Sequence, residues 1–274
     1  MPELPEVRVV IKALKEKILN KTIAELEILK PKLFKEKPIE TFRQKLINST
    51  IKNIENKGKY IIFHFNNDGV LISHLRMEGK YRFFERKTEN HKHTMAKFIF
   101  NDGTELHYLD SRMFGTLYLR NNKNWNATLP LSKLAPEPSK INIEDLYNKI
   151  SKSTTAIKTK LLDQTLVAGL GNIYVDEALF ASKVHPATKA KNIPITKLKE
   201  IIDNGAKIME KSYQFGGTTI HSYESLNKQI GSYQNYLQIH SDKIKNCLIC
   251  KNETTKIKIN GRGTYLCSNC QKEY

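Results

Sequence analysis

The chain has 274 residues, of which 39% are hydrophobic and 27% are charged. This length suggests one large or two ordinary domains with their own cores, and it excludes a mini-scaffold. The longest apolar runs are far too short to span a membrane, and the first residues are acidic where a secretion signal needs a basic start. We therefore expect a soluble, intracellular and cytoplasmic protein.

The charge balance is strongly basic. Lys and Arg number 45 against 28 Asp and Glu, which gives a net charge of +17. Such an excess favours a polyanionic partner, nucleic acid before a membrane surface. Most of the basic residues are lysines in a chain that is also rich in Asn and Ile, so the excess can equally reflect composition bias on solvated faces. Charge alone leaves nucleic-acid binding open.

The first half of the chain predicts a β-sandwich with one leading helix. Apolar residues recur at helical spacing over 5–19, and Pro5 is tolerated in a first turn, so Pro2 lies just ahead of a helix N-terminus. From 22 to 120 the pattern changes to short strand-like runs, and Asp68-Gly69 and Asp102-Gly103 carry the hairpin signal. The runs are Thr22–Leu29, Tyr60–Phe65, Val70–His74, Lys80–Phe84, Met95–Phe100, Glu105–Tyr108 and Thr116–Arg120.

The second half is predicted to be helical. A polar, proline-containing stretch over about 121–140 indicates a linker. Spaced apolar residues then predict four helices, at Ile143–Ile150, Lys158–Val167, Ile173–Lys183 and Ile195–Tyr213. The Gly-x-Gly-Asn turn at 169–172 can present backbone N–H groups to a phosphate, although Gly-rich turns between helices are common. Residues 214–236 lack a clear period, and a loop of that length is usually functional or mobile.

All four cysteines lie in the last 28 residues, as two Cys-x2-Cys pairs with 16 residues between them. This spacing is typical of a closed, structural zinc site. Two disulfides or free thiols are the alternative, which the lack of an export signal disfavours. The ligands are Cys247, Cys250, Cys267 and Cys270.

A hairpin is expected between the two cysteine pairs. Thr255–Ile259 forms one arm, residues 260–263 the turn, and Tyr265 begins the return. Arg262 then lies at the tip, where an arginine between glycines suits a phosphate clamp or is an ordinary exposed charge; spacing alone does not separate the two.

Four stretches, taken together and in order, resemble the formamidopyrimidine-DNA glycosylases, and the resemblance runs from the first residue to the last. They are Pro2-Glu3-Leu4-Pro5-Glu6-Val7, Asp163-Gln164 with Gly169-Leu170-Gly171-Asn172-Ile173-Tyr174, Gly216-Gly217-Thr218-Thr219-Ile220, and the zinc hairpin.

The resemblance implies an α+β chain. We expect a catalytic β-sandwich domain with its leading helix (1–130), a linker (131–140), a helix–two-turns–helix domain (141–236) with a lesion-recognition loop (214–230), and a four-cysteine zinc finger (237–274). It also implies a base-excision repair enzyme that acts as a monomer on damaged double-stranded DNA, removes oxidised purines such as 8-oxoguanine and formamidopyrimidines, and then cleaves the strand.

The resemblance further implies the catalytic residues. Removal of Met1 frees the secondary amine of Pro2, which attacks C1′ of the damaged nucleotide and forms an iminium intermediate. Glu3 moves protons during opening of the sugar ring. Lys59 assists β-elimination, and Arg262 matches the finger arginine tied to δ-elimination. The expected DNA contacts are Met77, His91, Arg112, Phe114, Lys158 and Asn172, and the expected lesion contacts are Glu78, Thr218, Thr219, His221 and Tyr223.

Among the DNA contacts, Met77, Arg112 and Phe114 are expected to fill the gap that a flipped base leaves, with Arg112 facing the orphaned cytosine. Several positions depart from the family pattern. They are Arg8, the pair Asn56-Lys57 where the family usually has two arginines, and His221.

Two other functions fit parts of the sequence. The endonuclease VIII type shares the Pro2-Glu3 start but removes oxidised pyrimidines, and Leu4 with the Gly-Gly-Thr-Thr stretch favours the purine enzyme. A catalytically silent zinc-finger DNA-binding protein is the second, and the intact Pro2, Glu3 and Lys59 argue against it.

Overall fold

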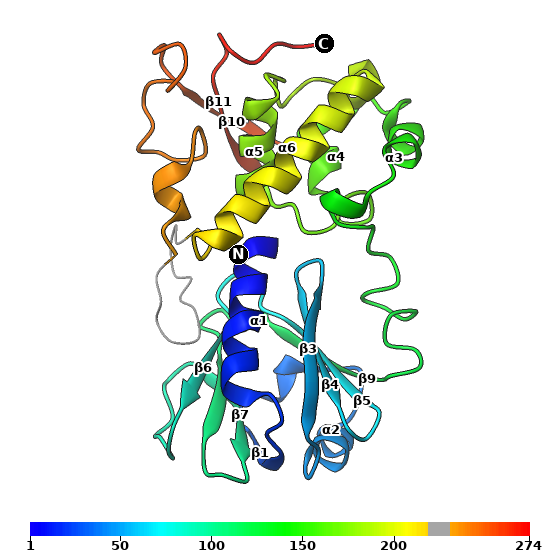
Figure 1. Ribbon diagram of the computed structural model, residues 1–274, viewed down its shortest axis with the longest axis vertical. Coiled ribbons are helices and arrows are strands. Elements are labelled where there is room, and N and C mark those ends of the chain that lie inside the picture. The colour runs from blue at the N-terminus through cyan, green and yellow to red at the C-terminus, as the bar shows by residue number, and fades with distance from the viewer. Residues whose placement is uncertain (219–230) are drawn as a thin grey trace. The chain divides into compact units, whose positions relative to one another are not determined.

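The computed structural model describes residues 1–218 and 231–274. It contains two compact units (Figure 1). The first comprises Met1–Ser132 and Gly216–Ser232, and the second comprises Lys133–Phe215 and Tyr233–Tyr274. In the described part of the chain, no helix combines the length and the hydropathy that a membrane crossing needs.

Helix α1 (Leu4–Ile18) leads the first unit. Its N-terminus is a capping box, in which the Glu3 side chain accepts from the backbone N–H of Glu6 and the Glu6 side chain accepts from that of Glu3. Pro5 fits the first turn because its missing N–H has no helical partner there. The predicted leading helix is confirmed, one residue earlier at each end.

The strands of the first unit form two sheets. Their orders are β1-β7-β8-β6 and β2-β9-β5-β4-β3. All neighbouring strands are antiparallel except β2 and β9. The strands are β1 (Ile23–Ile28), β2 (Phe34–Lys35), β3 (Ile51–Lys57), β4 (Tyr60–Phe65), β5 (Gly69–His74), β6 (Lys80–Phe84), β7 (Thr94–Phe100), β8 (Glu105–Leu109) and β9 (Thr116–Asn121).

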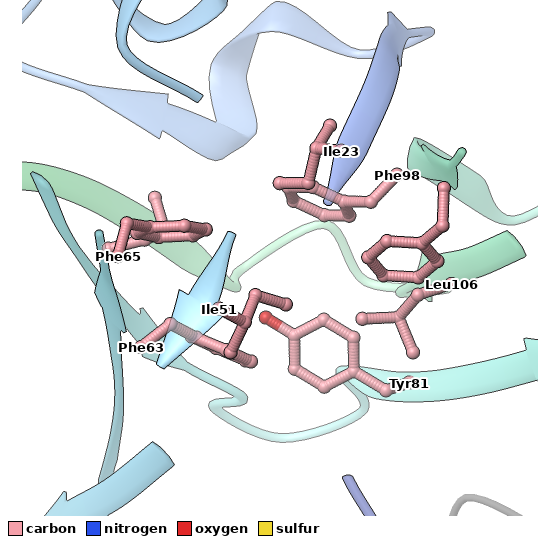
Figure 2. A pocket seen from close by; sticks show the side chains of 9 residues that line it. Ile23, Ile51, Phe63, Phe65, Tyr81, Phe98 and Leu106 are labelled. Atoms are coloured by element: carbon pink, nitrogen blue, oxygen red, sulfur yellow. The ribbon is translucent and has the colours of Figure 1, made fainter. Parts of the chain in front are cut away.

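The core of the first unit lies between these sheets. Figure 2 shows apolar side chains from both sheets facing one another around a small gap. The labelled residues there are Ile23, Ile51, Phe63, Phe65, Tyr81, Phe98 and Leu106. The predicted sandwich is confirmed, and the two Asp-Gly pairs stand at the β4–β5 and β7–β8 turns.

Two loops of this unit cross between the sheets at neighbouring places. Residues 75–79 lead from β5 to β6, and residues 110–115 lead from β8 to β9. Because β5 pairs with β9 and β6 pairs with β8, the loops begin and end beside each other: His74 is opposite Thr116, and Lys80 is opposite Leu109. The topology therefore brings together two segments that are far apart in the sequence.

Three pieces of this unit were not predicted as elements. These are η1 (Pro31–Leu33) with the short strand β2, helix α2 (Ile39–Leu46), and strand β3. In β3 a register shift between Ile51 and Asn53 interrupts the alternation of buried and exposed side chains. The apolar pattern of this strand therefore has no period of two, which is the signal for a strand.

The second unit is built on four helices. They are α3 (Ile143–Ile150), α4 (Ile157–Leu162), α5 (Asn172–Ala181) and α6 (Ile195–Gln214), with the short turns η2 (Pro138–Lys140), η3 (Ala190–Asn192) and η4 (Tyr233–Tyr236). Asn142 caps α3 by accepting from the backbone N–H groups of Glu144 and Asp145. The four predicted helices are confirmed, although α4 ends earlier than expected, at Leu162 instead of Val167.

A two-stranded hairpin, β10 (Thr255–Ile259) and β11 (Arg262–Leu266), completes the second unit. Asn260 and Gly261 both have positive φ, of 45° and 77°, and this lets two residues close the turn. The turn is thus shorter than predicted. Arg262 is the first residue of the return strand, opposite Ile259, and is not at the tip of the loop.

Candidate functional site

The N-terminal residues of α1 are buried although Met1 is 45% exposed. Pro2, Glu3 and Glu6 all lie below the surface. A nitrogen ahead of a helix N-terminus feels the positive end of the helix dipole, and burial acts in the same direction; both lower the pKa of an amine. While Met1 is attached, the Pro2 nitrogen is an amide, whose lone pair is delocalised into the carbonyl group and is not available for attack.

Glu6 joins this N-terminus to the residues at 217–218. One carboxylate oxygen accepts from the backbone N–H of Glu3 at 2.9 Å. The other accepts from the backbone N–H and the hydroxyl of Thr218 at 2.9 and 3.0 Å. Thr218, an expected lesion contact, is therefore tied to the segment that holds Pro2.

Close packing around Gly217 makes this contact possible. Gly217 has a φ of +82°, and a Cβ there would lie 3.0 Å from Glu6 Oε1. On the other side, a Cβ at Gly231 would lie 2.3 Å from the carbonyl oxygen of Gly217. Gly217 therefore requires glycine for its backbone conformation, and Gly231 requires it for space. Three further expected lesion contacts lie outside the described residues: Thr219, His221 and Tyr223.

Lys59 lies buried in the β3–β4 turn. The neighbouring His74 stacks edge-on against Tyr60, with ring centroids 4.5 Å apart. Burial, together with the charges of Arg76 and Lys59, lowers the pKa of His74 to about 3. The imidazole is therefore neutral at physiological pH and adds no positive charge beside the lysine.

Lys57, a departure from the family pattern, is engaged elsewhere. Its ammonium group donates to the Asn126 side chain and, at 3.0 Å, to the carbonyl oxygen of Leu131. It holds residues 126–131 against the end of β3. His91 is exposed, in the segment between β6 and β7, and its Nδ1 accepts from the backbone N–H of His93.

The two crossing loops carry exposed side chains. Met77 is 37% and Phe114 is 53% exposed, and the Arg112 guanidinium lies 4.8 Å from the centre of the Phe114 ring. Asp110, which is buried, accepts from the backbone N–H groups of Arg112, Phe114 and Gly115 at 2.8–3.0 Å. Glu78, which is half-buried, adjoins Met77. The loops thus bring the three expected gap-filling residues to one edge of the sandwich.

In the second unit, Arg262, Lys158 and Asn172 meet at the hairpin. Lys158 and Asn172 donate to the carbonyl oxygen of Gly263, at 3.2 and 2.9 Å, directly beside Arg262. Lys158 is fully buried, and its ammonium group also pairs with Asp176 at 2.6 Å. Lys158, an expected phosphate contact, thus has its ammonium group engaged within the second unit.

Sequence reasoning missed the acidic residues of α5. Asp176 pairs with Lys158 and also accepts from His240 Nδ1 at 2.7 Å and from the backbone N–H of Tyr265. Glu177 accepts from three successive backbone N–H groups, those of 238–240, at 2.8–2.9 Å. Two carboxylates inside an otherwise apolar helix are the signal that was available, because buried charges in proteins are paired.

The four cysteines cluster as a metal site requires. Their Sγ atoms all lie within 4.8 Å of one another, and the two closest pairs are 3.5 and 3.7 Å apart. Bonds of about 2.3 Å in a tetrahedral zinc site space the sulfurs by about 3.8 Å, so the thiols fit zinc. A disulfide needs sulfurs about 2.05 Å apart, so the alternative of two disulfides is wrong. The backbone N–H of Asn252 lowers the pKa of Cys250 to about 6, whereas burial raises the pKa values of Cys267 and Cys270.

Family models match most of the chain. They are the formamidopyrimidine-DNA glycosylase N-terminal domain over residues 1–117, the H2TH domain of the same glycosylase over 134–224, and the zinc finger found in FPG and IleRS over 245–272.

Individual proteins match over nearly their full length. A formamidopyrimidine-DNA glycosylase from Mycoplasmopsis pulmonis is 50% identical over 100% of this chain and 99% of its own, and one from Lactobacillus gasseri is 42% identical over 100% of both. A solved complex of Lactococcus lactis Fpg with abasic-site DNA has a TM-score of 0.92 at 36% identity, covering 99% of this chain and 100% of that one. A second, with N7-benzyl-Fapy-dG DNA, has 0.93 at 37% identity and the same coverage. The chain therefore belongs to the formamidopyrimidine-DNA glycosylase family.

Proposed function

We propose that this protein is a bifunctional base-excision repair enzyme that removes oxidised purines, 8-oxoguanine and formamidopyrimidines, from duplex DNA and then cleaves the strand at the abasic site. Full-length family membership supports the glycosylase, and the Lactococcus enzymes bound to Fapy-dG and abasic DNA support the substrate class. The single observation that carries the mechanism is the buried Pro2-Glu3 start of α1, held by Glu6.

The first chemical step uses the Pro2 amine, which is free once Met1 has been removed. Its lone pair attacks C1′ of the damaged nucleotide, the bond from C1′ to the base breaks, and the base leaves with the electron pair and a proton. Loss of the amine proton and opening of the sugar ring give an iminium between Pro2 and C1′. We assign Glu3 to the proton transfer to the ring oxygen, because its carboxyl adjoins the amine.

The iminium then makes the C2′ proton acidic. Loss of that proton expels the 3′-phosphate in β-elimination, and a second proton loss expels the 5′-phosphate in δ-elimination. We assign Lys59 to the first elimination and Arg262 to the second. His74 is neutral at physiological pH, so Lys59 is the cation of this pair that can act on the phosphate.

The remaining assignments concern binding. Met77, Arg112 and Phe114 fill the gap left by the flipped base, and His91 and Asn172 contact the backbone phosphates. We assign Lys158 to holding the hairpin that carries Arg262, because its ammonium group is buried against Asp176. The lesion contacts remain those expected: Glu78, Thr218, Thr219, His221 and Tyr223.

The zinc and domain assignments complete the proposal. Cys247, Cys250, Cys267 and Cys270 hold one Zn²⁺ that closes the finger and takes no part in the reaction. We keep 1–130, 131–140, 141–236 and 237–274 as the domain boundaries, and the cytoplasm as the compartment in which the enzyme meets DNA.

Borohydride trapping tests this function. With a duplex that contains 8-oxoguanine opposite cytosine, the wild-type protein should give a covalent adduct that mass spectrometry maps to Pro2. Pro2→Gly replaces the secondary amine by a primary one, so its adduct at that position should form more slowly. A duplex with thymine glycol is the matched comparison for the endonuclease VIII type. An adduct mapped to a lysine in the wild-type protein would refute the N-terminal mechanism, and faster excision of thymine glycol would refute the purine specificity.

A further inference from the structure

The two loops that carry the gap-filling side chains close over one buried hydroxyl group. Tyr108, in β8, is fully buried, and its hydroxyl donates to the carbonyl oxygen of His74 at a long 3.4 Å. A Cβ added at Gly115 would lie 1.8 Å from this hydroxyl oxygen, and one added at Gly79 would lie 2.3 Å from it. Neither glycine has a positive φ, so space and not backbone conformation requires glycine at both positions.

The topology explains why one residue reaches both loops. Tyr108 is the second-last residue of β8, which ends at the start of loop 110–115 and pairs with β6, which begins at the end of loop 75–79. Tyr81 in β6 is its direct partner, with ring centroids 5.1 Å apart. The Tyr108 hydroxyl therefore stands at the place where both loops change sheets.

Both loops also contain a strained residue beside an exposed side chain. Arg76 has a φ of 55° next to Met77, and Met113 has a φ of 54° between Arg112 and Phe114. A residue other than glycine keeps such a conformation when its surroundings fix it. Asp110 fixes one loop through three backbone N–H groups, and the bond from Gly79 N–H to Leu75 O closes the other.

We propose that Tyr108 is a positioning residue that locks the two loops together, so that Met77 on one loop and Arg112 and Phe114 on the other enter the duplex as one rigid unit. This inference rests on the proposed function and deepens it. Reading of the orphaned base by Arg112 then depends on the first loop as well as on its own. The preference for cytosine opposite the lesion depends on the position of the Arg112 donors. If the two loops are loosened, we expect this preference to be lost first.

Tyr108→Phe removes the hydroxyl and keeps the ring, so the variant should fold. Tyr81→Phe is the matched control, since its hydroxyl is also buried but bonds to the side chain of Ser73 and not to the carbonyl oxygen of His74, after which loop 75–79 begins. We would measure kcat/KM for excision of 8-oxoguanine opposite cytosine and opposite adenine, and borohydride trapping on a single-stranded abasic oligonucleotide, which has no gap to fill.

We expect Tyr108→Phe to lower the cytosine-to-adenine ratio by about three- to tenfold, the effect of one lost hydrogen-bonding group, while trapping on the single strand stays unchanged. Tyr81→Phe should keep the wild-type ratio. An unchanged ratio in Tyr108→Phe would overturn the inference, and so would an equal loss on all three substrates, because that is the result of a general loss of folded enzyme. Inactivity of the wild-type protein on every substrate would instead refute the proposed function.

Discussion

Glu6 makes both a local contact, within the N-terminus of α1, and a contact with a residue far away in the sequence. Within α1 it completes the capping box with Glu3, a role that its spacing in the sequence indicates. The same carboxylate also binds Thr218, 212 positions away. One buried side chain thus fixes both the residue next to Pro2 and the residue that begins the expected lesion contacts.

Glu6→Gln tests this double role. The amide keeps the shape of the side chain, but it must turn an N–H₂ group toward either the Glu3 N–H or the Thr218 donors, and this leaves a buried donor without an acceptor. We expect the excision rate on 8-oxoguanine to fall by about tenfold or more. The measurement is single-turnover excision.

Glu16→Gln supplies the control for that experiment, because Glu16 lies on the same helix, is exposed, and loses the same charge. Its excision rate should equal that of the wild-type protein. Equal rates in both variants would contradict the double role of Glu6.

At the scale of secondary-structure elements, helices α4 and α5 position the hairpin β10–β11 and, with it, Arg262. Lys158 from α4 and Asn172 and Asp176 from α5 bind the return strand at Gly263 and Tyr265. Arg262 therefore projects from a strand that is held from beneath by three side chains. The buried pair of Lys158 and Asp176 leaves an uncompensated charge if either partner is removed alone.

Lys158→Met should displace Arg262 and thereby reduce δ-elimination more than β-elimination. We expect the ratio of δ- to β-product on abasic duplex DNA to fall by about tenfold, in the same direction as in Arg262→Ala. The double variant should be no worse than Arg262→Ala alone, since both changes remove one arginine contact. Gel separation of the two products is the measurement.

Lys152→Met is the control, because Lys152 is an exposed lysine in the turn before α4. It should leave the product ratio unchanged. A ratio in Lys158→Met equal to that of the wild-type protein would mean that the hairpin keeps its place without the buried pair.

The elements differ in how far the sequence predicts them. Strands β4 to β9 and helices α1, α3, α5 and α6 have regular apolar periods, and their positions agree with the structure to within a few residues. The bulge in β3 hides that strand, because the extra residue breaks the period of two. The short helix α2 carries helical spacing, but it stands among strands and was not separated from them.

The candidate site was harder to predict from the sequence than the fold. Spacing identified the four cysteines, and the hairpin around Arg262 was predicted except for the length of its turn. The roles of Pro2, Lys59 and Arg112 came from family resemblance, because single residues of these types have no period. The partners that hold the site, Tyr108 and Asp176 among them, depend on contacts between distant segments, which a single sequence does not contain.

At the scale of the whole molecule, each unit contributes a different part of the proposed chemistry. The first holds Pro2, Glu3 and Lys59, and the second holds Arg262 and all four cysteines. Zinc binding acts directly on the second unit alone. Removal of zinc should therefore reduce δ-elimination before it reduces the reaction at Pro2, instead of abolishing both at once.

Chelation of zinc is the corresponding experiment. Structural zinc contributes several kcal/mol to folding, so we expect the Tm of the second unit to fall by about 10 °C or more. Loss of δ-elimination should precede loss of trapping at Pro2 as chelator is added, and readdition of Zn²⁺ should restore both. Differential scanning calorimetry and product gels would record these changes; loss of trapping before loss of δ-elimination would contradict the assignment.

The hydrogen bonds from the backbone N–H groups of 238–240 to Glu177 have a consequence for hydrogen exchange. These residues belong to no helix or strand, and irregular backbone normally exchanges its amide protons quickly. Here one buried carboxylate accepts from all three amides. The three protons should exchange as slowly as those of helix α5 and all speed up together in Glu177→Gln, so that an irregular segment shares the opening events of the helix that holds it.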